Sequence, residues 1–343
     1  MANDAKPKPW DSEYPAVSYS ESQDRRRRRC ARSHYHSVFT AHQGWRAKPH
    51  SDSWRAYRAK KAVPLSTAVG TAVHEAAGQC VEAIRKGSGI PSFDALRATA
   101  AASLNARWRN SRRNLGGFMR EPKRVPVFLE ALYGDAPTRS DLLRANQVLD
   151  RALWGLVRCE IVWYWVRSAE AADVIVMAPF TSVEIMTPQG KTTCYGAADL
   201  IVRPSPTAPW HIIDFKTGSA DGVVDQILTY ALVARDSLHL SVATGCTGVV
   251  VALGEHPDDA VSVFWVSEQD LAGASQRLQE NIEEVRSLLA NQQSGAPRPI
   301  EAFPQTLSPR ACSWCAFRVL CHPDQVAEDA IIASRPIPRM TAA

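Results

Sequence analysis

Two short apolar runs joined by a proline-containing loop constrain this chain most. They are Gly196-Ala-Ala-Asp199-Leu-Ile-Val202 and His211-Ile-Ile-Asp214-Phe-Lys216-Thr-Gly218. Apolar runs of this length, bounded by turn residues, are typical of buried strands. Because alternate residues of a strand share a face, Asp214 and Lys216 point to one side and their apolar neighbours to the other. We therefore expect an exposed Asp-x-Lys pair at a strand end, near Asp199.

Two aspartates and a lysine placed in this way suit one kind of chemistry. Carboxylates bind hard divalent cations through oxygen and leave positions for water and a phosphate oxygen. A nearby ammonium can orient the attacking water or offset the negative charge that develops on the phosphate. The set fits phosphodiester hydrolysis, and the alternative is a solvated strand end with an ordinary ion pair.

The run from Asp225 to Ala234 is predicted to form an amphipathic helix. Gln226 and Tyr230 are four residues apart and so lie on one face of it. The pair could brace the strand-end site or contact a nucleic-acid backbone.

Residues 66–85 form a second helical run, with Ser66 or Thr67 as its expected N-cap. His74 lies on this run. A lone histidine on such a helix is more often a packed core residue than a metal ligand, so the run alone leaves its role open.

The order of these pieces resembles a known family. Gly70-x-x-x-His74, Gly196-x-x-Asp199, Asp214-x-Lys216 and Gln226-x-x-x-Tyr230 follow one another as in RecB-type nucleases of the PD-(D/E)xK superfamily. The resemblance implies that His74, Asp199 and Asp214 bind Mg²⁺ or Mn²⁺. It also implies that Lys216 is the catalytic lysine and that Gln226 and Tyr230 form the motif that follows it. The match spans His74 to Tyr230 and contains a long insertion.

Four of the eight cysteines form a second pattern. Cys312, Cys315 and Cys321 have the spacing C-x-x-C-x5-C, and Cys30 lies near the other end of the chain. Four thiolates suit a [4Fe–4S] cluster or structural zinc equally, and His322 keeps a mixed zinc site open. The set resembles the cluster ligands of AddB-type nucleases and of the CRISPR-associated nucleases that process new spacers. That resemblance favours iron–sulfur, whereas the remaining cysteines lie in apolar surroundings and are expected in the core.

Charge is unevenly distributed along the chain. Residues 1–62 carry a net charge of +8, residues 91–175 carry +4, and residues 176–343 carry −7. Two basic blocks thus precede the acidic segment with the carboxylates, and a metal enzyme that acts on a polyanion would need such cationic walls around its acidic centre. The run Arg25 to Arg29 could be a solvated helix face, a phosphate-binding arm or a disordered tract.

The block 91–175 is mostly helical in pattern and is predicted to be an all-α insertion, with one helical run over 142–166. Basic residues cluster there around an aromatic one, a combination able to grip phosphates and stack an unpaired base; they are Arg107, Trp108, Arg109, Arg112 and Arg113. Trp154, Trp163 and Trp165 lie among apolar residues and are expected in the core.

From residue 174 the pattern changes to strands. They are expected at 174–177, 182–186, 194–202, 211–215, 248–253 and 261–266, followed by a helix over 268–289 and a linker over 291–297. The fold class is α/β, a restriction-endonuclease-like mixed sheet flanked by helices, with the all-α insertion and a cysteine-clamped cluster arm. We divide the chain into a basic N-terminal arm (1–62), a core helix (63–90), the insertion (91–175), the core (176–292) and a C-terminal iron–sulfur arm (293–343).

No apolar run reaches the roughly 20 residues of a membrane span, and no secretory signal is recognisable, so we expect a cytoplasmic protein. No G-x-x-x-x-G-K-[ST] loop is present, so unwinding would need a partner helicase. We expect a metal-dependent DNA nuclease, an exonuclease acting on single-stranded DNA or DNA ends. The alternatives are a zinc-stapled nuclease, a DNA-binding iron–sulfur module with a vestigial site, and a redox sensor. Repair, recombination, spacer acquisition and phage-related processing all fit.

Overall fold

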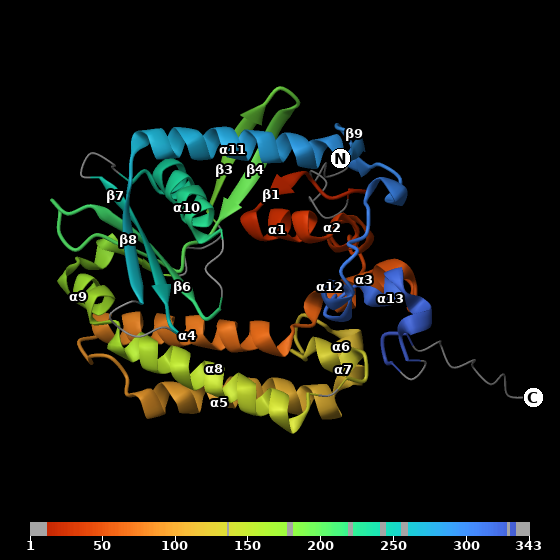
Figure 1. The fold of residues 1–343 in the computed structure, drawn as a ribbon, viewed down its shortest axis with the longest axis horizontal. Coiled ribbons are helices and arrows are strands. Elements are labelled where there is room, and N and C mark those ends of the chain that lie inside the picture. The colour runs from red at the N-terminus through yellow and green to blue at the C-terminus, as the bar shows by residue number, and fades with distance from the viewer. Residues whose placement is uncertain are drawn as a thin grey trace, which may run out of the picture.

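The structure, a computed structural model, describes residues 12–135, 137–176, 181–218, 222–240, 245–254, 260–327 and 330–333. Its centre is a five-stranded mixed sheet in the order β2-β5-β6-β7-β8, next to a three-stranded sheet in the order β1-β4-β3 (Figure 1). The strands are β1 Ser18–Tyr19, β2 Val174–Val176, β3 Thr181–Thr187, β4 Gly190–Gly196, β5 Leu200–Val202, β6 Trp210–Lys216, β7 Cys246–Ala252 and β8 Val261–Val266. In the larger sheet only β6 and β7 pair in parallel, among the strands that the structure describes. The predicted mixed α/β fold is confirmed.

Helices cover both faces of this sheet. The α-helices in the described ranges are α1 Glu21–Arg29, α2 Ala31–Tyr35, α3 Asp52–Lys61, α4 Leu65–Arg85, α5 Phe93–Arg113, α6 Leu115–Arg120, α7 Leu129–Leu132, α8 Arg139–Arg158, α9 Glu160–Ser168, α10 Val223–Leu238, α11 Glu268–Ser287, α12 Pro309–Ser313 and α13 Arg318–Cys321. Figure 1 shows α4, α8 and α5 stacked below the sheet, with α10 and α11 above it. The layers follow from the alternation of β6, whose Ile213 and Phe215 join the core of the lower helices while Ile212 joins that of the upper ones.

Several predicted boundaries are wrong. The strand expected over 194–202 is two strands in different sheets, β4 and β5, with Asp199 in the segment between them. The helix expected over 142–166 is interrupted at Cys159, between α8 and α9. The helix expected over 268–289 ends at Ser287, and Leu289 belongs to β9 Leu289–Asn291, which pairs with β10 Ala296–Pro297 inside the linker expected over 291–297. The strand expected to end at Met177 is described to Val176, and Met177 lies outside the described residues.

Two side-chain expectations also need correction. Helix α4 begins at Leu65 after Pro64, and no side chain of its own N-terminus caps it. Instead Glu130 Oε1 accepts a hydrogen bond from the Leu65 amide at 2.9 Å, so a distant carboxylate replaces the expected cap. Trp163 is buried as expected, but Trp154 is 45% exposed. Its indole stacks on Phe93, with ring centroids 4.3 Å apart, and the Arg158 guanidinium lies 5.0 Å from the ring centroid.

The two ends of the described chain lie side by side. Strand β1 pairs in parallel with β4, and α1 behind it is tied to α11 by Arg27 to Glu284 at 2.5 Å and by Arg28 to Asn281 at 2.5 Å. Figure 1 shows α12 and α13 next to α3. A third apolar core joins these arms, in which Phe317 and Val319 pack with residues of α3, α6 and α7.

Candidate active site

The end of β6 carries the Asp-x-Lys pair. Asp214 Oδ2 lies 2.5 Å from Lys216 Nζ, so the two side chains do share a face. The expectation of an exposed pair is wrong for the aspartate, because Asp214 is only 3% exposed. It lies inside β6, whose partner strand β7 places Val250 beside it. Lys216, the last residue of the strand, is half-buried and reaches the surface.

Asp199 links the strands to helix α4. Its Oδ1 lies 2.8 Å from His74 Nδ1, and its Oδ2 accepts a hydrogen bond from the Phe215 amide at 2.8 Å. The second bond fixes the segment between β4 and β5 against β6, between the two residues of the Asp-x-Lys pair. His74 therefore lies at the same site and is not a core histidine.

Helix α10 adds an amide and a phenol. Lys216 Nζ donates to Gln226 Oε1 at 3.1 Å, and Gln226 Nε2 donates to Tyr230 Oη. The helix approaches closely because Gly196 has no side chain: a Cβ there would lie 3.1 Å from Val233 and 3.3 Å from Tyr230. The structure thus brings six predicted residues together, which we call the strand-end network: His74, Asp199, Asp214, Lys216, Gln226 and Tyr230.

Burial and like charge perturb the acids of this network. Burial, followed by the charge of Asp199, raises the pKa of Asp214 to about 6 despite the opposing charge of Lys216. Burial lowers the pKa of His74, but the hydrogen bond and charge of Asp199 outweigh it, so the pKa is raised overall. Burial also raises the pKa of Tyr230, which keeps the phenol neutral.

The network suits a divalent cation at Asp214. Although Asp214 Oδ2 is close to Lys216, this buried oxygen accepts no hydrogen bond of acceptable geometry from the described residues. The Lys216 ammonium, 2.5 Å away, already offsets the charge of this carboxylate, and a cation held with Asp199 and His74 would bind through its oxygens beside that lysine. Within the described residues, however, no three His, Cys, Asp or Glu side chains are already arranged as a metal site. In their present positions, His74 and Asp199 are hydrogen-bonded to one another and do not converge on a common point with Asp214.

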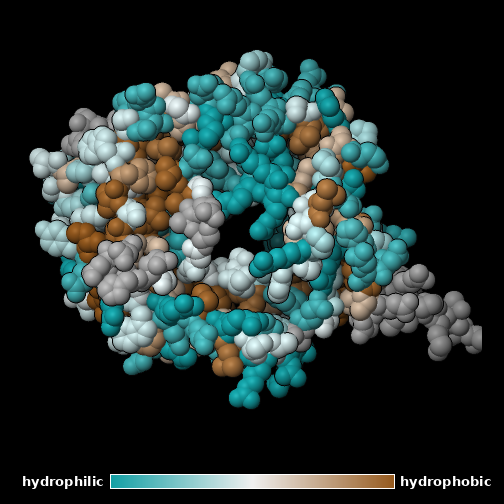
Figure 2. Space-filling view, viewed as in Figure 1, coloured by the Kyte–Doolittle hydropathy of each residue, from teal (hydrophilic) through white to brown (hydrophobic). Residues whose placement is uncertain are grey.

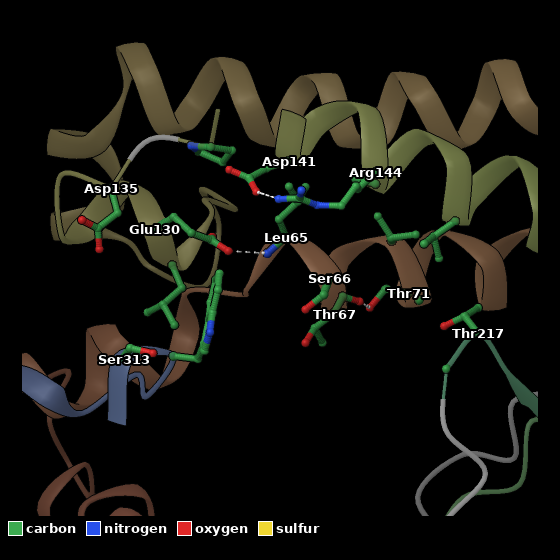
Figure 3. A pocket seen from close by; sticks show the side chains of 18 of the residues that line it. Leu65, Ser66, Thr67, Thr71, Glu130, Asp135, Asp141, Arg144, Thr217 and Ser313 are labelled. Carbon is green, nitrogen blue, oxygen red and sulfur yellow. Dashed lines mark hydrogen bonds and ion pairs between the residues drawn. The ribbon is translucent and has the colours of Figure 1, made fainter. Parts of the chain in front are cut away.

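A cavity of about 1430 Å³ opens beside the network, and we call it the strand-end cavity. His74, Lys216 and Gly218 line one part of it, and residues of α4, α8 and the C-terminal arm line the rest. In Figure 3, Ser66, Thr67 and Thr71 project from α4 toward the space between Ser313 and Thr217. Figure 2 shows a hollow in the centre of this face of the molecule, with hydrophilic side chains above it. The cavity is large enough to admit a stretch of nucleic-acid strand.

The four predicted cluster cysteines line a second cavity of about 1200 Å³, the cysteine cavity: Cys30, Cys312, Cys315 and Cys321, with His322 also on its wall. Burial raises the pKa of Cys321 to about 11, and the charges of Cys315 and Cys30 add to the effect. Such mutual influence requires the thiols to be near one another. In the part of the chain that the structure describes, their sulfurs are not yet arranged as a metal site.

The remaining cysteines are buried and free. They are Cys80, Cys159, Cys194 and Cys246, and burial raises the pKa of each thiol. They have the expected character of small core residues.

The predicted nucleic-acid cluster on α5 lies elsewhere. Arg107 donates to the Val127 carbonyl at 3.4 Å, and Trp108 packs 6.3 Å from the Phe128 ring with Arg112 over its face at 5.7 Å. Neither Arg109 nor Arg113 lines the strand-end cavity or the cysteine cavity. The structure does not bring this cluster to the strand-end network.

One residue of the site was missed. Arg25, within the arginine run, lines the strand-end cavity, and its Nη2 donates to Gln226 Oε1 at 3.3 Å. The run itself is helix α1, so it is not a disordered tract. No local signal in the sequence could have found this contact, because Gln226 lies 201 positions after Arg25.

The comparisons with known proteins agree with the geometry. A family model described as PD-(D/E)XK nuclease superfamily matches residues 18–322, which is most of the chain. No curated protein matches it. No helix in the described ranges has the length and apolar character needed to cross a membrane. The match includes every residue of the strand-end network and the four cysteines of the second cavity. The chain belongs to the PD-(D/E)XK nuclease superfamily.

Proposed function

We propose that this protein is a metal-dependent DNA nuclease that hydrolyses phosphodiester bonds as an exonuclease on single strands or DNA ends. The observation that carries the proposal is the strand-end network, in which His74, Asp199 and Asp214 come together with Lys216 beside a large cavity. Asp214, Asp199 and His74 would hold Mg²⁺ or Mn²⁺. A histidine ligand makes Mn²⁺ comparatively more favourable than at an all-oxygen site.

The bound cation would supply Lewis-acid polarisation of the phosphate and a more acidic water. The chain's own residues do the rest. Gln226 and Asp214 hold the Lys216 ammonium at the cavity wall, where it can orient water or offset negative charge on the phosphate. Tyr230 is neutral and transfers no proton in this scheme. Instead it fixes the Gln226 amide, whose oxygen thereby faces Lys216.

We also propose that Cys30, Cys312, Cys315 and Cys321 hold a [4Fe–4S] cluster. Their shared cavity and mutual effect on pKa support this, as does the four-thiolate donor set. The thiols must lose their protons to bind, so assembly should release protons and be favoured at higher pH. Structural zinc is the competing result, and metal analysis of anaerobically purified protein separates the two.

The decisive experiment uses metal-stripped protein, re-added Mn²⁺ and end-labelled single-stranded DNA, with a circular single strand in parallel. Cleavage of the linear strand alone supports an exonuclease, and cleavage of both indicates an endonuclease. DNA binding without cleavage of either would favour the alternative, a DNA-binding iron–sulfur module that serves a partner helicase. Loss of both binding and cleavage would leave a redox role for the cysteines.

A further inference from the structure

The arginines of α1 have different partners. Arg27 and Arg28 both pair with the buried Asp24, at 2.7 Å each, and also bind α11. Arg26 donates to Ser37. Arg25 is exposed and, among the described residues, pairs with no carboxylate; its one protein acceptor there is the Gln226 amide. The run therefore docks the helix with some arginines and leaves Arg25 with uncompensated charge.

The position of Arg25 is fixed by the packing of α1 on α10. Thr229 Oγ1 donates to Glu21 Oε1 at 2.8 Å, and one helical turn further along α1 Arg25 reaches Gln226. Residues four apart on α1 thus face residues three apart on α10, as expected where two helices share one contact line. Because Glu21 is anchored one turn away, α1 places Arg25 beside Gln226 at the edge of the network.

Arg25 and Lys216 share one acceptor. Arg25 Nη2 lies 3.3 Å and Lys216 Nζ lies 3.1 Å from Gln226 Oε1, and both residues line the strand-end cavity. Since both nitrogens are within 3.3 Å of the same oxygen, a single phosphate could contact both. A guanidinium has five donors in a planar fork that matches two phosphate oxygens, and among the described residues only one of these donors is engaged.

We propose that Arg25 binds the reacting phosphate of the nucleic-acid strand, together with Lys216. This inference rests on the proposed function and deepens it. The N-terminal arm thereby supplies a cation to the active site of the sheet. Preorganised donors of this kind act on the charge that builds up on the phosphate, so Arg25 should affect turnover more than strand affinity.

The test compares Arg25→Ala, Arg25→Lys and the control Arg29→Ala, which removes the same charge one turn along α1. Both arginines line the cysteine cavity, but only Arg25 also lines the strand-end cavity, so the two variants differ in that second contact. We expect Arg25→Ala to lower kcat roughly 10²-fold, as for the loss of one oxyanion donor. Arg25→Lys should recover part of the loss, and millimolar guanidinium should restore turnover to Arg25→Ala. Arg29→Ala should stay close to the parent protein. An effect of structure alone would not respond to guanidinium.

Equal losses in Arg25→Ala and Arg29→Ala without guanidinium rescue, or parental turnover in Arg25→Ala, would overturn the proposal. A second readout keeps it separate from the proposed function. In anisotropy titrations with single-stranded DNA in Ca²⁺, Arg25→Ala should reduce the slope of log affinity against log salt by about 0.7. If the parent protein never cleaves but this slope falls, the nuclease proposal fails and the phosphate contact stands. If the parent protein cleaves but the slope of Arg25→Ala is unchanged, the nuclease proposal stands and the phosphate contact of Arg25 fails.

Discussion

The strand-end network and the cysteine cavity collect reactive side chains in opposite ways. The network takes its residues from α4, the β4–β5 segment, β6 and α10, and these residues bond to one another and to the Phe215 amide. The cysteine cavity takes its thiols from short helices and turns near the two ends of the chain. Its sulfurs receive weak contacts, such as those from the Ser33 and Phe317 amides at 3.4 Å each.

The two regions differ in what positions their side chains. A sheet and two packed helices define the positions of Asp199, Asp214 and Lys216, so the polar groups are oriented before any substrate enters. Thiols on short segments at distant points of the chain are positioned chiefly by what they bind. The first region should therefore tolerate loss of its cation without unfolding, whereas the second should depend on its bound group.

The largest effect should come from Asp214→Asn, which keeps the shape of the side chain but removes the charge for the cation. We expect cleavage to fall at least about 10³-fold, equivalent to roughly 4 kcal/mol, when measured with Mn²⁺ and labelled single strands. Lys216→Ala should give a comparable loss. Turnover like that of the parent in either variant would remove the strand-end network from the reaction.

The same variant should not be destabilised. The pKa of Asp214 is raised to about 6 in the folded protein, so the contribution of this one group to the stability of the metal-free parent is lost as pH rises from about 4 to 6. The amide of Asp214→Asn does not ionise, so this variant should gain stability relative to the parent over that range. Urea unfolding at pH 5 and pH 7 measures this, and a less stable variant at pH 7 would contradict the preorganised network.

Next in size, Cys30→Ser should lower stability by several kcal/mol and remove the bound metal, because a clamp between distant segments then lacks one ligand. The matched control is Cys246→Ser, since Cys246 is buried in the sheet and lies outside the cysteine cavity. The Cys246→Ser variant should retain the bound metal. Iron and zinc analysis with thermal unfolding provides the readout, and undiminished iron in Cys30→Ser would disprove the clamp.

Lowering the pH should also distinguish the two regions, because they should unfold at different pH values. Burial lowers the pKa of His34, His36 and His211 to about 4 each. The unfolded chain binds protons more readily, so stability is present above about pH 6.5 and lost as pH falls toward 4, on the order of 2 kcal/mol per histidine after allowing for solvent.

Two of these histidines lie in the N-terminal arm and one in the sheet, where it stacks on Trp165 at 4.0 Å. The arm should therefore open first. Cysteine labelling should begin at a higher pH than loss of far-ultraviolet circular dichroism. In His211→Gln, only the loss of circular dichroism should shift to lower pH. Coincident transitions in the parent protein would show that both regions unfold as one unit.

The smallest effect concerns the cluster on α5. Replacing Arg109, Arg112 and Arg113 by alanine should lower the salt slope of single-strand binding by about 0.7 for each phosphate that these side chains neutralise. Turnover at saturating DNA should be nearly unchanged, because these residues do not line the strand-end cavity. An unchanged slope would limit nucleic-acid binding to the two cavities and the residues between them.

The sequence alone was enough to predict how side chains lie relative to one another where they are close in the chain and follow a strand or helix period. The face shared by Asp214 and Lys216 and the i, i+4 pair Gln226 and Tyr230 follow from strand and helix periods. The burial of Asp214 did not follow from these periods, because it depends on the neighbouring strand, where Val250 lies beside it. The split between β4 and β5 was hidden for the same reason, since strand pairing and not the apolar run decides where each strand ends.

Long-range interactions account for the other failures. Glu130 replaces the expected cap of α4 from 65 residues away, and Arg25 reaches Gln226 across 201 residues. No local pattern contains such pairs. The four cysteines were grouped by resemblance, and only the fold places them on one cavity wall.

The docking of α1 on α10 and α11 also bears on synthesis. Helix α1 leaves the ribosome before its partners Thr229, Asn281 and Glu284, which are made more than 200 residues later. At roughly 5–20 residues per second, this helix waits on the order of tens of seconds for a surface to settle on. An unfinished chain therefore lacks the contacts that hold Arg25 at Gln226. A truncated product of translation would carry Asp214 and Lys216 without that helix in place, which delays assembly of the whole site until α10 and α11 have emerged.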